Sequence, residues 1–123
     1  MQTILVVDND DMMRTLMLDI LGEKYKVILA PDGEIGLGLF EKNETEIRLV
    51  ITDLIMPVMN GFEMSKAIRA LSLNVKIIVY SSSISLEECQ ILFGLAGVRV
   101  SKFLSKPTRV QEIKKLVGKL LQE

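Results

Sequence analysis

The sequence predicts an α/β fold, in which a doubly wound, five-stranded parallel sheet forms a single domain over residues 1–123. Short β-branched, apolar runs alternate with longer stretches whose apolar residues recur at helical spacing. Alternation of this kind places helices on both faces of a parallel sheet, with right-handed crossovers. The length of 123 residues is enough for one domain with a real core.

The five expected strands are short runs rich in β-branched residues. The first, at 4–7, reads Ile-Leu-Val-Val without a break, as a strand buried on both faces should. The others are expected at 26–29, 49–52, 76–80 and 100–104. Turn or break signals separate these runs from the helices, at Pro31-Asp32-Gly33, Met56-Pro57, Asn60-Gly61 and Lys106-Pro107.

Apolar residues spaced three and four apart indicate the helices. The second helix, at 34–40, is the weakest, because Gly36 and Gly38 each cost about 1 kcal/mol against alanine inside a helix. The first helix ends near Gly22. The apolar stripe of the first helix is Met13, Leu16, Met17, Ile20 and Leu21, and that of the third is Met64, Ala67, Ile68 and Leu71. The fourth helix is expected over residues 86–95. The stripe of the fifth helix is Val110, Ile113, Leu116, Val117 and Leu120.

Composition restricts the classes of function. Fifteen basic residues face sixteen acidic ones, so no strong field draws the chain to nucleic acid or to a membrane surface, and we expect neither as a direct partner. The apolar runs fall short of the roughly 18–20 residues that a membrane span needs. One cysteine and no visible signal peptide favour a cytoplasmic location. The chain has no histidine, so any phosphohistidine must come from another molecule.

Polar side chains follow four of the expected strands. Asp8 follows the first, Asp53 the third, Ser81 the fourth and Lys106 the fifth. In parallel sheets the functional site lies beyond the carboxyl ends of the strands, so these residues should meet. Converging carboxylates need a cation between them, and Mg²⁺ prefers oxygen ligands of this kind. A lysine and a hydroxyl complete a site suited to a phosphoryl group.

Over essentially its whole length the chain resembles the receiver domains of response regulators, the CheY-like domains of two-component signalling. The pattern Asp-x-x-Met-Pro-x-x-x-Gly beginning at Asp53, with a later Lys106-Pro107, is the most specific part. The other matching segments are Ile4-Leu5-Val6-Val7-Asp8, Ser81-Ser82, Ala96-Gly97 and Phe103-Leu104-Ser105. The resemblance implies the flavodoxin-like (βα)5 receiver fold.

The resemblance also implies roles for individual residues. It identifies Asp53 as the phosphoacceptor and Lys106 as the lysine that pairs with the phosphoryl group. Asp8, Asn9, Asp53 and the backbone carbonyl of Ile55 would hold Mg²⁺, the implied cofactor. A cis peptide bond is expected before the proline that follows Lys106.

Three positions and one segment depart from the family pattern or leave a choice. Asn9 stands where a second acidic residue is usual, and its neutral amide predicts weaker Mg²⁺ binding. Either Ser81 or Ser82 can supply the switch hydroxyl, and the strand register favours Ser81. Phe103 occupies the position of the aromatic switch residue, although a plain core role is the alternative. Compared with the receiver domains that the chain resembles, the segment 98–101 is about two residues longer than usual.

The expected function is therefore a phosphorylation switch. A sensor histidine kinase or histidine phosphotransfer protein would donate to Asp53, and the change would reach an output domain or protein through the fourth helix, fifth strand and fifth helix. Apart from its own phosphotransfer and dephosphorylation, no enzymatic activity is expected. A phosphate-independent binding module is the alternative that Asn9 favours. A dehalogenase-type phosphatase based on Asp8-Asn9-Asp10 fits less well, because Met12 departs from that motif. Stand-alone and multidomain arrangements are both compatible with the sequence.

Overall fold

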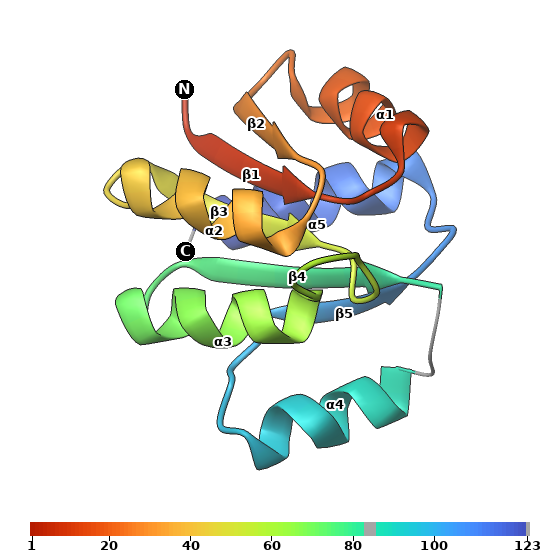
Figure 1. Ribbon diagram of the computed structural model, residues 1–123. Helices are drawn as coiled ribbons and strands as arrows, with labels where there is room; N and C mark the ends of the chain where they lie inside the picture. The colour runs from red at the N-terminus through yellow and green to blue at the C-terminus, as the bar shows by residue number, and fades with distance from the viewer. Residues whose placement is uncertain (83–85, 123) are drawn as a thin grey trace.

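The structure is a computed structural model that describes residues 1–82 and 86–122. Strands and helices alternate along the chain, and all five strands are parallel in the order β2-β1-β3-β4-β5 (Figure 1). The strands are β1 (Thr3–Val7), β2 (Lys26–Ala30), β3 (Ile47–Thr52), β4 (Lys76–Ser81) and β5 (Lys102–Ser105). The helices are α1 (Asp11–Leu21), α2 (Gly33–Lys42), α3 (Gly61–Leu71), α4 (Leu86–Leu95) and α5 (Val110–Gln122). The predicted fold class is confirmed.

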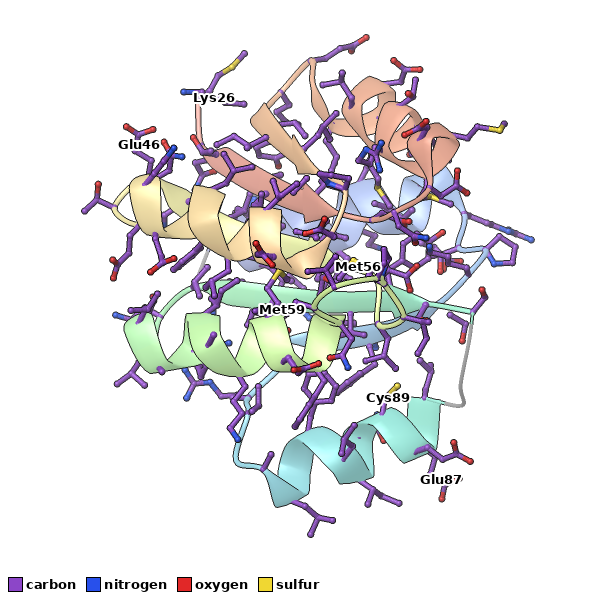
Figure 2. All side chains as sticks on the ribbon, viewed as in Figure 1. Lys26, Glu46, Met56, Met59, Glu87 and Cys89 are labelled. Atoms are coloured by element: carbon purple, nitrogen blue, oxygen red, sulfur yellow. The ribbon has the colours of Figure 1, made fainter. Side chains whose placement is uncertain are left out.

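The sheet separates two apolar layers. One packs residues of α2, α3 and α4 against the first face, and the other packs residues of α1 and α5 against the second. β1 contributes to both layers, since every residue of it is at most 4% exposed. Figure 2 shows Cys89 on the side of α4 that faces the sheet, where its thiol is fully buried. Among the described residues, no helix combines the length and the apolar character that crossing a bilayer requires.

α2 forms despite its two glycines, and it begins one residue earlier and ends two residues later than predicted. A Cβ on Gly36 would lie 2.9 Å from atoms of Met64 and Val7. Glycine at this position therefore allows α2 to pack closely against α3 and β1, and the tertiary contact outweighs the poor helix propensity.

Two strands begin two residues away from the predicted position, whereas the other strand ends differ by at most one residue. β3 begins at Ile47 rather than 49, because the exposed Arg48 interrupts the apolar run without ending the pairing with β1. β5 begins at Lys102 rather than 100. The Ser101 hydroxyl accepts from the Ile77 amide (3.2 Å), so a side-chain oxygen replaces a backbone carbonyl as the partner of this amide. Regular pairing between β4 and β5 therefore begins at Lys102.

The segment that enters β5 is held by a buried arginine. The guanidinium of Arg69, on α3, donates to the backbone carbonyls of Arg99 (2.7 Å) and Val75 (2.7 Å). This fixes residues 98–101 against the amino end of β4 and sets the position from which β5 runs toward the site.

Candidate functional site

Three of the predicted site residues meet at the carboxyl edge of the sheet. The ammonium of Lys106 lies 2.7 Å from Oδ2 of Asp8 and 3.1 Å from Oδ2 of Asp53. All three side chains are largely withdrawn from solvent, with exposed fractions of 14%, 4% and 11% respectively. The lysine thus bridges two carboxylates that would otherwise repel one another in a region of low dielectric.

Asp8 is fixed by the turn from β1 into α1. Its amide continues the ladder to Ala30 of β2 (3.1 Å), and its Oδ1 accepts from the Asp10 amide (2.9 Å). The Asp10 side chain in turn caps α1 by accepting from the Met12 amide (2.9 Å). Asp10 therefore serves as the N-cap of α1, and the second oxygen of Asp8 faces the site.

Asp53 is held equally firmly at the end of β3. Its amide donates to the carbonyl of Val7 (3.0 Å), and its Oδ1 accepts from the Leu54 amide (2.7 Å). The hydroxyl of Thr52 donates to the Asp53 carbonyl (2.7 Å). One carboxylate oxygen is thereby used for orientation, which leaves Oδ2 for the lysine or for chemistry.

The loop from β3 to α3 closes tightly on Asp53. The amide of Gly61 donates to the Leu54 carbonyl (2.8 Å), and a Cβ at Gly61 would stand 2.0 Å from the carbonyl oxygen of Asp53. Only glycine allows the start of α3 to approach the backbone this closely. Figure 2 shows Met56 and Met59 on this loop, where both pack against the core beside α3.

The charge state of Lys106 follows from its surroundings. Burial lowers the pKa of its ammonium, but the hydrogen bonds to Asp8 and Asp53 and the charges of these carboxylates outweigh it. The pKa therefore lies above its ordinary value of 10.5, and the side chain is cationic at neutral pH. The Lys106-Pro107 peptide bond is cis, as the resemblance implied.

The oxygen atoms at this edge suit a hard cation. Mg²⁺ takes one or two carboxylates together with waters and phosphate oxygens, and Asp8 and Asp53 each direct one oxygen to the same point. Among the described residues no three His, Cys, Asp or Glu side chains gather as a metal cluster. Asn9 is exposed beside Asp8, and Ile55 is 54% exposed in the loop after Asp53.

The two serines that could act as switch hydroxyls differ in their surroundings. Ser81 is the last residue of β4 and is 2% exposed, whereas Ser82 lies beyond the strand and is exposed. The carbonyl of Ser81 accepts from the Lys106 amide (3.2 Å), which joins the two strand ends. The strand register pairs Val79 with Phe103 and Ser81 with Ser105.

Phe103 lies half-buried on the α4 side of the sheet. Its ring packs edge-on against Phe93 of α4, with 5.4 Å between ring centroids. Because side chains alternate along a strand, Val79 and Ser81 face the same side as Phe103. The hydroxyl and the aromatic ring that the sequence singled out therefore share one face of the sheet.

Two neighbours of the site were missed in the sequence. The guanidinium of Arg14 donates to the Asp8 carbonyl and to the Asp11 carboxylate, and its place three residues after Asp11 was an available signal. The ring of Tyr80 lies under the Lys106 ammonium, 5.5 Å from ring centroid to nitrogen. A tyrosine inside an otherwise apolar strand was the signal there, because its buried hydroxyl needs a partner.

The family model of the response regulator receiver domain matches residues 4–118. A 3′,5′-cyclic-nucleotide phosphodiesterase of Dictyostelium discoideum is 30% identical over 97% of the chain, and a putative two-component response regulator of Arabidopsis thaliana is 32% identical over 92% of it. The chain spans 15% and 18% of the lengths of these two curated relatives.

Solved structures show the same arrangement of the chain. A chemotaxis protein of Vibrio cholerae superposes with a TM-score of 0.84 at 28% identity, covering 98% of both chains. A response regulator of Thermotoga maritima, solved in complex with Mg²⁺ and BeF, superposes with a TM-score of 0.83 at 30% identity, covering 98% of this chain and 99% of that one. The chain belongs to the response regulator receiver domain family of two-component signalling.

Proposed function

We propose that Asp53 is the phosphoacceptor of this receiver domain and that residues 1–123 act as one switching unit. The observation that carries the proposal is the bridge between Asp8, Lys106 and Asp53, in which one oxygen of Asp53 is oriented by the Leu54 amide and the other meets an ammonium. A carboxylate held in this way is a nucleophile with a counter-ion already in place.

The donor must be an external phosphohistidine or a small acyl phosphate, because the chain contains no histidine. An oxygen of Asp53 attacks the phosphorus, the bond from phosphorus to the imidazole nitrogen breaks, and its electron pair stays on the imidazole. Lys106 offsets the charge that gathers on the phosphoryl oxygens. Bound Mg²⁺ would be held by Asp8, Asp53, the Asn9 amide and the Ile55 carbonyl, and it would neutralise charge on the phosphoryl group.

The proposed partners follow from the relatives. Sensor kinases of Vibrio harveyi and Escherichia coli are among the proteins that share this domain, at 30% and 34% identity. We expect a sensor histidine kinase or a histidine phosphotransfer protein as donor and an output domain or protein as receiver of the signal. A cytoplasmic location belongs to the same proposal.

The switch would act on the face where Ser81 and Phe103 lie. A dianionic phosphoryl group on Asp53 attracts the Ser81 hydroxyl and Lys106, and movement of Ser81 frees space for Phe103. The output surface would comprise α4, β5 and α5. Its α4 part already exposes apolar side chains, with Ile91 57% and Leu95 85% exposed. No enzymatic activity beyond the domain's own phosphotransfer and dephosphorylation is proposed.

Intact-mass measurement after incubation with acetyl phosphate tests the proposal. We expect a single phosphoryl adduct that requires Mg²⁺ and is absent from Asp53→Asn. Asp19→Asn, an exposed carboxylate on α1, is the matched control and should be phosphorylated normally. If the folded parent protein gave no adduct with acetyl phosphate or with a histidine kinase, the phosphate-independent binding module would replace this proposal.

A further inference from the structure

Tyr80 stands directly under the lysine of the site. It is the residue before Ser81 on β4 and is 4% exposed, within the layer formed by α1 and α5. The ammonium of Lys106 lies 5.5 Å from the centroid of its ring, within the range of a cation–π contact. The two residues approach because β4 and β5 pair in register, with Tyr80 opposite Leu104.

The tyrosine hydroxyl holds the turn that carries this lysine. The amide of Thr108 donates to the Tyr80 hydroxyl (3.2 Å), and the hydroxyl of Thr108 donates to the carbonyl of Ser105 (2.6 Å). The tyrosine side chain therefore makes two contacts. Its ring contacts the Lys106 ammonium, and its hydroxyl oxygen accepts a hydrogen bond from the turn that follows Lys106.

The ring also belongs to the packed underside of the site. With Asp8, Asp53, Met13 and Met17 it lines a cavity that has no room for a water molecule. Charge interactions are stronger in such a dry region than in solvent, and a cation–π contact gains from the same desolvation. A lysine side chain has a long, flexible stem, so a contact on its distal end restricts it effectively.

We propose that Tyr80 is a positioning residue for Lys106, an inference that rests on the phosphoacceptor function proposed above. Its ring holds the ammonium beside Asp8 and Asp53, at the place where the phosphoryl oxygens would arrive. The ammonium can turn from the carboxylates toward those oxygens while it remains over the ring. Tyr80 contacts neither the phosphorus nor the donor and acts through the lysine.

Matched variants separate this role from simple core packing. Tyr80→Phe keeps the ring and removes only the hydroxyl that accepts from the Thr108 amide, so it should be phosphorylated by acetyl phosphate faster than Tyr80→Leu. Tyr80→Leu removes the ring and should slow phosphorylation about tenfold, the scale of a desolvated cation–π contact. Tyr25→Leu is the control, since Tyr25 is a core tyrosine of the same layer away from the site. It should lose stability without losing the phosphorylation rate.

Two further measurements keep the test decisive even if Tyr80→Leu does not fold. A ring-fluorinated phenylalanine at position 80 keeps the shape but weakens the attraction for a cation, so it should phosphorylate more slowly than Tyr80→Phe. In a Lys106→Met background, changing Tyr80 to leucine or fluorinating the phenylalanine should have no further effect on the rate.

The parent protein provides the internal standard. If it forms the adduct and all folded ring variants match it in rate, or if the ring effect persists without the lysine, the positioning role is wrong while the phosphoacceptor function stands. A parent without any adduct would instead overturn the function itself, and the positioning role with it.

Discussion

The ammonium of Lys106 lies 2.7 Å from Oδ2 of Asp8, although the two residues are 98 positions apart in the chain. This is the shorter of the two ion pairs that join the ends of β1, β3 and β5. It makes the lysine the cation that balances both carboxylates when no metal is bound, and several measurable consequences follow from that balance.

Removal of the lysine should destabilise the metal-free protein. Lys106→Met leaves Asp8 and Asp53 buried and facing each other without a counter-ion, a change expected to cost about 3 kcal/mol in the free energy of unfolding. Urea unfolding in EDTA measures this cost. Adding Mg²⁺ should recover part of it in the variant, because the metal replaces the missing charge.

Lys102→Met is the matched control for that experiment, since Lys102 is exposed at the start of β5, the strand that leads to Lys106. It should change the free energy of unfolding by less than about 0.5 kcal/mol, as surface substitutions usually do. Equal stability of Lys106→Met and the parent in EDTA would mean that the bridge contributes nothing to the fold.

The raised pKa of Lys106 predicts a pH dependence at the alkaline end. The folded protein holds the lysine proton more tightly than the unfolded chain, so the stabilisation is fully present below pH 10.5 and is lost as the pH rises through the higher folded pKa. The difference in unfolding free energy between the parent and Lys106→Met, measured in EDTA, should shrink over that range. A difference that stayed constant or grew would show that the pKa is not raised.

Asn9→Asp should strengthen Mg²⁺ binding. The substitution adds a carboxylate beside Asp8, and attraction of one more charge to a divalent ion near the protein surface corresponds to about a tenfold lower dissociation constant. Isothermal titration calorimetry measures the change. The same variant should be less stable than the parent in EDTA, because it adds a like charge to Asp8 and Asp53. An unchanged affinity would remove position 9 from the metal site.

Val58 occupies a strained backbone conformation that can be relieved. Its φ is +68°, in the left-handed region that β-branched residues rarely adopt, and its side chain is 75% exposed in the loop after Asp53. Val58→Asn should raise the free energy of unfolding by about 1 kcal/mol, because asparagine tolerates this region. Leu73→Asn, at another exposed loop position, should give no such gain.

The sequence predicted the sheet and the residues at its edge, because the carboxyl ends of parallel strands must lie together. Asp8, Asp53 and Lys106 were found in this way. It could not predict which oxygen each carboxylate presents, since that depends on local bonds such as the one from the Leu54 amide to Asp53. The boundary of β5 was missed for a similar reason, because the Ser101 side chain replaces a ladder bond.

The role proposed for Tyr80 could not be predicted from the sequence. Alternation along β4 indicates which face its side chain occupies, but the reach of Lys106 across the strand end depends on the conformation of a long, flexible side chain. For α2, the sequence predicted too weak a helix. Helix propensity alone disfavours Gly36 in α2, but the packing of Gly36 against Val7 and Met64, which only the tertiary structure provides, outweighs it.

The most direct test of the central claim is to locate the phosphoryl group. Protein phosphorylated with acetyl phosphate and Mg²⁺ would be reduced with borohydride, which converts an acyl phosphate to an alcohol, and then mapped by peptide mass spectrometry. We expect homoserine at Asp53 alone, and none when Mg²⁺ is left out. Homoserine at Asp8 or at another carboxylate, with Asp53 intact, would contradict it.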